Sequence, residues 1–222
     1  MKQYDKEKPL IFLHIPKCAG TSFMRVLRKW FGNDFYGHYF DEENNKMPPK
    51  VNLKGGICIQ GHFNKVRKFG VMDYYPEVDQ FITILRDPFE IAVSNYFYIK
   101  KKIRQGGNWL ADRPRIENRY RNISGYLKVY RSNILNYMPY QMTMDNHEEI
   151  FEKYFVYVGI AEDMQTSVNM LARKLGFCVI KVSHENISER DEEVPIGMKE
   201  EFINKHQLEY AIYNYALRSY KQ

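Results

Sequence analysis

Four short apolar runs, separated by helical patterns, limit the folds open to this chain of 222 residues. The runs are rich in β-branched and aromatic side chains, which is typical of buried strands. Between and after them, apolar side chains recur at helical spacing, as in 23–31 and 208–216. Strands that alternate with helices predict an α/β fold in which a mostly parallel sheet is flanked by helices. We expect the strands over 10–15, 57–59, 81–85 and 156–160.

The length of the chain suits one domain with a sizeable core, and we assign residues 1–222 to a single domain. No apolar run has the length of a membrane helix, and the first ten residues lack the core of a signal peptide. The cysteines Cys18, Cys58 and Cys178 are odd in number and include no close pair, which favours a reducing compartment. We therefore expect a cytoplasmic protein with no membrane span. The scattered histidines indicate no metal site.

The stretch "HIPKCAGTSF", residues 14–23, lies where the first expected strand gives way to a helix. The unpaired N–H groups of a helix's first turn, together with the helix dipole, favour an anion at this place. Gly20 permits close approach to the backbone, Thr21 and Ser22 offer hydroxyl donors, and Lys17 adds a positive charge. The loop is therefore interpreted as a binding site for phosphate or sulfate. The alternative is a plain strand-to-helix turn with an exposed lysine.

Two better-known phosphate loops do not fit this stretch. In the nucleotide triphosphatase loop, lysine directly follows the second glycine, whereas here Thr21 follows Gly20 and the lysine comes three residues earlier. A cysteine-based phosphatase would need an arginine six positions after Cys18, where the chain has Met24. We interpret Cys18 as a small loop residue with a dispensable side chain.

A second strand-to-helix junction occurs in "FITILRDPFEIAVSNYF", residues 81–97. Asp87 is a suitable N-cap and Pro88 suits the first helical position. Arg86 would lie at the strand end, and Ser94 two turns into the helix. An arginine fork with a hydroxyl can bind a second phosphate. The alternative is an arginine paired to Asp87, with Ser94 simply buried.

The two loops in this order resemble those of sulfotransferases that use 3′-phosphoadenosine 5′-phosphosulfate (PAPS). The similarity includes the "QGHF" segment between the loops and looks closest to the carbohydrate branch of the heparan sulfate 2-O type. It implies a fold related to P-loop nucleotide-binding proteins, PAPS as sulfuryl donor, 3′,5′-adenosine bisphosphate as product, no metal, and an acceptor hydroxyl. The resemblance implies that the 3′-phosphate is held by Arg86 and Ser94. It implies that the 5′-phosphosulfate is held by the first loop, with Lys17, Cys18, Ala19, Gly20, Thr21 and Ser22.

His62 is the candidate general base. It comes just after an expected strand, at the sheet edge where ligands bind in open α/β folds. The resembling family has its base in a Gly-His segment at this place. The 2-O enzymes have a further histidine two residues earlier, where this chain has Gln60. The alternative for His62 is a structural role. His14 is a less suitable base, and we interpret it as a packing residue at the strand end.

The segment 99–131 concentrates the positive charge of the chain. It has ten lysine and arginine residues against two acids, Asp112 and Glu117, which gives it a net charge of +8, while the whole chain carries +6. This is either a solvated basic surface or a site for an anionic partner. For a sulfotransferase we expect an anionic saccharide acceptor there. The candidate contacts are Lys100, Lys101, Arg104, Arg113 and Arg115.

Two other functions are compatible with parts of the sequence. A P-loop kinase for a small molecule would prefer ATP with Mg²⁺. A nucleic-acid-binding module would use the basic segment and depend steeply on salt, but it would leave both loops without a role. We therefore do not expect nucleic acid as the partner.

Overall fold

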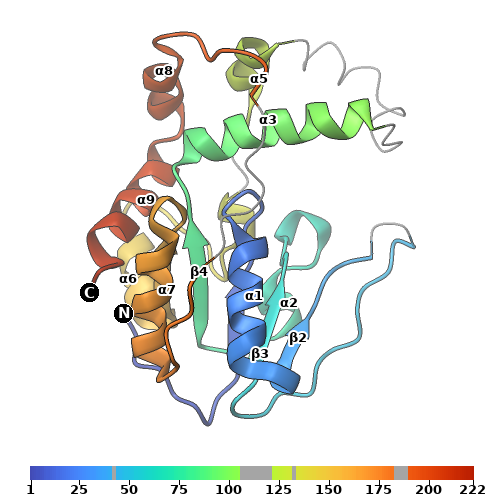
Figure 1. Cartoon of the computed structure of the whole chain (residues 1–222), viewed down its shortest axis with the longest axis vertical. Coiled ribbons are helices and arrows are strands. Elements are labelled where there is room, and N and C mark those ends of the chain that lie inside the picture. The colour runs from blue at the N-terminus through green and yellow to red at the C-terminus, as the bar shows by residue number, and fades with distance from the viewer. Residues whose placement is uncertain (42–43, 106–121, 132–133, 183–189) are drawn as a thin grey trace.

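Five parallel strands form one sheet in the order β2-β3-β1-β4-β5. The computed structural model describes residues 1–41, 44–105, 122–131, 134–182 and 190–222 (Figure 1). The strands are β1 (Leu10–Leu13), β2 (Phe35–Gly37), β3 (Cys58–Gly61), β4 (Phe81–Leu85) and β5 (Phe155–Ile160). The predicted α/β class and the mostly parallel sheet are confirmed.

The central strand β1 lies between β3 and β4, with Leu13 paired to Gly61 on one side and to Thr83 on the other. The chain first builds β2 and β3 on one side of β1 and then β4 and β5 on the other. This change of direction occurs at β1, and ligands of open α/β sheets bind beyond the carboxyl ends of the strands at such a point. The loops after β1, β3 and β4 therefore meet at one edge.

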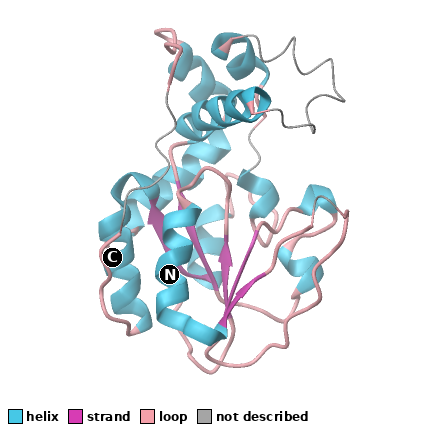
Figure 2. Cartoon of the chain, turned by 45° about the vertical axis from the view of Figure 1, so that its right-hand side comes forward, coloured by secondary structure: helices cyan, strands magenta, loops and turns pink. Residues whose placement is uncertain are grey.

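Helices cover both faces of the sheet (Figure 2). The sheet itself is buried, because every residue of β1, β3, β4 and β5 is buried. Such fully buried parallel strands are read in sequence as continuous apolar runs. The α-helices around them are α1 (Gly20–Phe31), α2 (Val71–Tyr74), α6 (His147–Tyr154), α7 (Met164–Leu175) and α9 (Gln207–Ser219). The described 3-10 turns are η1 (Gly32–Asp34), η2 (Lys65–Arg67), η4 (Ile134–Tyr137) and η5 (Ala161–Asp163).

A second, smaller group of helices stands beyond the carboxyl edge of the sheet (Figure 1). Helix α3 (Pro88–Arg104) packs there against α5 (Ile123–Val129) and α8 (Met198–Lys205). They share a hydrophobic cluster of their own, which includes Phe97, Leu127 and Phe202. The candidate site therefore lies between the sheet edge and α3.

Asp87 fixes the start of α3, as predicted. Its carboxylate accepts hydrogen bonds from the backbone N–H groups of Phe89 (2.8 Å) and Glu90 (3.3 Å), and Pro88 occupies the first helical position. The same carboxylate pairs with Lys199 at 2.7 Å and accepts from the hydroxyl of Tyr210 at 3.0 Å. Because Arg86 precedes this cap, its backbone is held firmly at the end of β4.

The predicted strand bounds agree with the observed ones at half of the strand ends and differ by one or two residues at the others. The first strand ends at Leu13 because the chain turns into the loop before Pro16, which has no N–H to donate to a ladder. The edge strand β2 was not predicted, since it is three residues long and only partly buried. In the described parts of the chain, no helix combines the length and apolar character needed to cross a bilayer.

Candidate active site

The first loop folds back on itself before helix α1 begins. Lys17 and Ala19, which flank Cys18, both have positive φ angles, 68° and 55°. This is uncommon for residues with a Cβ, and strained backbone of this kind clusters at ligand sites. Ala19 is the N-cap of α1, and no side chain caps its N–H groups. The helix start is therefore exposed to an incoming anion.

Cys18 is buried, with 1% of its surface exposed, and it belongs to the main hydrophobic core. Its side chain therefore packs in the core, which the sequence did not predict, and its dispensability stays a prediction. Burial raises the pKa of the thiol, although Arg86 works against the rise. A protonated, buried thiol is a poor nucleophile, so the thiolate chemistry set aside in the sequence analysis has no support here.

Arg86 joins the second loop to the first. Its guanidinium donates to the backbone carbonyl of Lys17 at 3.2 Å and pairs with the carboxylate of Glu90 at 3.4 Å. The carboxylate that Arg86 pairs with is that of Glu90 and not that of Asp87, so the alternative pairing is wrong. Ser94 is buried and lies one turn beyond Glu90 on the same helix face. Arg86 thus contacts the first loop, and Ser94 lies on the helix face that carries its partner Glu90.

Positive charges gather at the loop. The pKa of Lys17 is lowered by burial and then by the charges of Arg86 and Lys101. The ammonium of Lys17 lies over the ring of Tyr98 on α3, 4.3 Å from its centroid. An anion bound here would remove the repulsion among these cations. Tyr98 could not be identified from the sequence, because nothing in its spacing distinguishes it from the other tyrosines among the 18 in the chain.

His62 follows directly on β3, so the structure places it at the predicted edge. Its Nδ1 lies 2.5 Å from the backbone carbonyl oxygen of His14. A carbonyl can only accept, so Nδ1 carries a proton and the neutral ring has its lone pair on Nε2. The ring also meets the edges of Tyr39 and Tyr137, at centroid distances of 5.0 and 6.3 Å. Neither tyrosine was identified from the sequence.

The side chain of His14 fills the space between Gly20 and His62. Its ring lies 4.2 Å from the ring of His62, centroid to centroid. A Cβ added to Gly20 would come within 1.7 Å of His14 Nε2. The packing role expected for His14 is confirmed. Gly20 was expected to allow an anion to approach the backbone closely. In the structure, the group that approaches it closely is the His14 ring.

Gly20→Ala should therefore destabilise the fold by about 1–3 kcal/mol, because a methyl group cannot enter without displacing the His14 ring. Urea denaturation measures the change. Gly37→Ala is the matched control, since the nearest atom to its added Cβ is at 3.7 Å and lies in an ordinary side-chain contact. Equal stability of the two variants would contradict the packing described for His14.

The basic segment has partners that its own sequence does not reveal. Lys100 pairs with Asp191 (3.0 Å) and Glu192 (3.4 Å), and Arg104 pairs with Asp191 (2.5 Å). The net charge of +8 counted within the segment is therefore partly offset by two acids from a distant part of the chain. Lys101 is exposed and acts electrostatically on Lys17. Arg113 and Arg115 lie outside the described residues.

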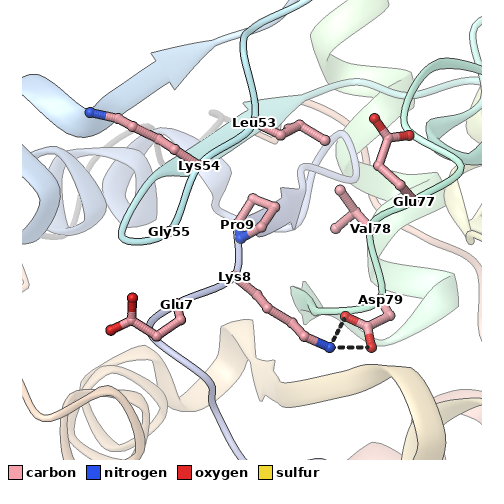
Figure 3. Close-up of a pocket in the computed structure, with 9 residues that line it drawn as sticks. All are labelled: Glu7, Lys8, Pro9, Leu53, Lys54, Gly55, Glu77, Val78 and Asp79. Carbon is pink, nitrogen blue, oxygen red and sulfur yellow. Dashed lines mark hydrogen bonds and ion pairs between the residues drawn. The ribbon is translucent and has the colours of Figure 1, made fainter.

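The described part of the structure contains two pockets that the loop residues do not line. One, of about 370 Å³, lies at the opposite, amino-terminal edge of the sheet, and its lysine and aspartate side chains, Lys8 and Asp79, pair with each other at 3.2 Å (Figure 3). The other, of about 730 Å³, is lined by Lys128, Val129, Tyr130 and Arg131 at the end of α5. The second pocket belongs to the basic segment, and its Tyr130 is near enough to Cys18 of the first loop to interact with it electrostatically.

The parallel sheet, the change of direction at β1 and the cationic loops at its carboxyl edge define an α/β domain of the phosphate-loop type. A sequence model of the Sulfotransferase family matches residues 3–215, and the chain belongs to this family. It is thus a sulfotransferase, a transferase that moves sulfuryl groups to hydroxyl-bearing acceptors. A search of curated proteins found no match. No group of three or more histidine, cysteine or acidic side chains able to hold a metal occurs among the described residues.

Proposed function

We propose that the protein transfers the sulfuryl group of PAPS to the hydroxyl of an acceptor, with His62 as general base and Lys17 stabilising the leaving group. The observation that carries this proposal is the 3.2 Å contact between the Arg86 guanidinium and the Lys17 carbonyl. It makes the two loops one cationic site, and His62 stands at the next strand end. A donor with phosphates at both its 5′ and 3′ positions needs such a double site.

The residues present fit this donor. The uncapped start of α1 and the Lys17 ammonium would hold the 5′-phosphosulfate, and the backbone of Ala19 would contribute its N–H group. The N–H group of Cys18 donates to the carbonyl of Ile15 at 3.4 Å and would contribute only by exchanging that partner. Gly20, Thr21 and Ser22 form the first turn of that helix. When bound, the donor supplies an activated sulfuryl group. The protein binds it through fixed charges and backbone dipoles.

His62 would take the proton of the acceptor hydroxyl on Nε2 as the oxygen forms its bond to sulfur. The bond between sulfur and the bridging phosphate oxygen would break in the same step, and Lys17 would stabilise the negative charge left on that oxygen. The contact from Nδ1 to His14 supports this role, because it places the basic lone pair on the other nitrogen of the ring. The charge of Lys17 would favour the transition state over the bound donor, since charge on the oxygen grows during the step.

Arg86 and Ser94 would bind the 3′-phosphate, which distinguishes this donor from ATP. We expect Arg86→Ala to weaken 3′,5′-adenosine bisphosphate binding by about 10–100-fold, because a charge-assisted hydrogen bond is lost. Ser94→Ala should have a smaller effect. Isothermal calorimetry measures both. The control ligand is adenosine 5′-monophosphate, which lacks the 3′-phosphate and should bind wild type and Arg86→Ala equally. An equal loss for both ligands would show that Arg86 supports the loop and does not read the 3′-phosphate.

For the acceptor we propose an anionic saccharide, as in the heparan sulfate 2-O branch. Lys101 beside the donor loop and the basic pocket at 128–131 support this proposal. Lys100 and Arg104 would contribute only by exchanging their present partner Asp191 for the acceptor. Arg113 and Arg115 stay predictions from the sequence.

Calorimetry with 3′,5′-adenosine bisphosphate and with ATP, each without Mg²⁺, tests the donor. The proposal requires tight binding of the first ligand and weak binding of the second. A preference for ATP with Mg²⁺ would favour a kinase. Labelled-sulfate transfer to 2-O-desulfated heparin, to neutral sugars and to simple alcohols then tests the acceptor. Transfer to neutral alcohols alone would rule out the anionic saccharide.

A further inference from the structure

The His14 side chain touches both halves of the proposed site. On one side its ring occupies the space next to the Gly20 backbone at the start of α1. On the other side it lies 4.2 Å from the His62 ring at an angle of 34°. It also stacks on Phe12, with ring centroids 5.6 Å apart. The ring therefore sets the spacing between the donor loop and the base.

A chain of hydrogen bonds holds this ring in place. The Tyr39 hydroxyl lies 2.9 Å from His14 Nδ1, and the amide Nε2 of Gln60 donates to the same hydroxyl. An amide nitrogen cannot accept, so the Tyr39 hydroxyl has its own proton to give to His14 Nδ1. Gln60 is fully buried on β3, which makes the anchor rigid. These hydrogen bonds thus connect Gln60 in the sheet core, through the Tyr39 hydroxyl, to the His14 ring at the site.

The imidazole ring of His14 is neutral near pH 7. Burial, and then the nearby His62, lower the pKa of His14 to about 3. A neutral ring cannot compete for the proton that the acceptor releases. It also adds no positive charge beside His62 when His62 becomes an imidazolium.

We propose that the His14 side chain, anchored by Tyr39, is a positioning residue that holds the His62 ring in register with the donor loop. This inference deepens the proposed function and rests on it for the role of His62. The His62–His14 backbone contact survives any substitution of His14. The variants described below therefore isolate the contribution of the side chain.

The first measurement follows the His62 ring by nitrogen-edited NMR during a pH titration and needs no donor or acceptor. In the wild type, the pattern should report a proton on Nδ1. In His14→Ala, water replaces the buried neighbour, so the pKa of His62 should rise and its ring signals should broaden. Tyr39→Phe should shift the same signals in the same direction by a smaller amount. His14→Asn, whose carbonyl oxygen can replace Nδ1 as the acceptor for Tyr39, should recover part of the wild-type pattern.

The second measurement separates turnover from donor binding. His14→Ala should lower kcat for sulfate transfer to 2-O-desulfated heparin by about 10–100-fold, because a small misplacement of a catalytic group is costly. The affinity for 3′,5′-adenosine bisphosphate should stay within about threefold. His38→Asn is the matched control. His38 is a second buried histidine next to a tyrosine hydroxyl, Tyr75 at 3.1 Å, but its ring packs on Phe63 and Phe69. The His38→Asn variant should change the stability of the fold and leave the NMR signals of the His62 ring unchanged.

An unchanged His62 titration in His14→Ala would overturn the proposal. A parallel loss of donor affinity and turnover would also overturn it, since His14 would then support only the loop. If the wild type bound no 3′,5′-adenosine bisphosphate, the proposed function would fail, while the NMR comparison would still decide whether His14 holds His62. Should His14→Ala fail to fold, Tyr39→Phe and His14→Asn provide the same comparison.

Discussion

Lys17→Ala is expected to lower the rate of sulfuryl transfer by about a thousandfold, because a preorganised charge at the leaving oxygen is lost. The fold should be retained, since Lys17 is a partly exposed loop residue whose ammonium, among the described residues, lies over the ring of Tyr98 and near the charges of Arg86 and Lys101. Donor turnover under saturating conditions is the measurement. Circular dichroism and urea denaturation verify that the loop variant is folded.

Lys102→Ala is a matched control for this prediction. The ammonium of Lys102 also lies over the Tyr98 ring, 5.8 Å from its centroid. Lys102 belongs to helix α3 and not to the first loop. It should retain nearly wild-type turnover. Wild-type turnover in Lys17→Ala would exclude the proposed role, whereas equal losses in both variants would indicate a general effect of positive charge.

The charge state of Lys17 gives this site a dependence on alkaline pH. Its pKa is lowered from 10.5, so the ammonium loses its proton earlier than an ordinary lysine does. Affinity for the anionic product should therefore be full below the lowered pKa and fall as pH rises through it. Lys17→Arg should remove this decrease, because an arginine stays charged. Binding titrations between neutral and alkaline pH make the comparison.

His62→Asn is expected to lower the turnover rate by a factor of about 10²–10⁴ and to retain the affinity for 3′,5′-adenosine bisphosphate. The asparagine amide can replace Nδ1–H as donor to the His14 carbonyl, so the backbone contact is kept and only the basic nitrogen is removed. His62→Ala, which removes both, should be equally inactive and less stable. Single-turnover transfer assays and calorimetry separate chemistry from binding.

Full activity of His62→Asn would assign the proton transfer to another group. His14 is a poor substitute, because its pKa of about 3 leaves it too weak a base at neutral pH. A loss of donor affinity equal to the loss of turnover would instead indicate that His62 holds the donor loop. The two variants at position 62 therefore test the base and its packing separately.

Local patterns were sufficient to predict the elements that carry the site. The apolar runs before His14 and Arg86 predicted buried strands, and Asp87 and Pro88 predicted the start of α3. These signals depend on neighbours in the chain, such as a cap three residues from the N–H group that it satisfies. Because the carboxyl ends of parallel strands share one edge, the placement of Lys17, Arg86 and His62 at that edge followed from the fold class.

Contacts between distant segments could not be predicted in this way. Asp191 and Glu192 pair with Lys100 and Arg104 from almost a hundred residues away, and no local pattern connects them. The burial of Cys18 was missed for a similar reason. The loop sequence alone does not show which side chains turn inward when two residues adopt positive φ.

The sequence by itself determined the fold class and the positions of the two strand-to-helix loops proposed to bind anions, because these depend on periodicity, capping and turn residues. Only the tertiary structure decided how these parts act on one another. It placed the His14 ring between Gly20 and His62, and it set the proton of His62 on Nδ1 through a backbone carbonyl. Such contacts depend on the register of β1 against β3, which is set by the packing of the whole sheet.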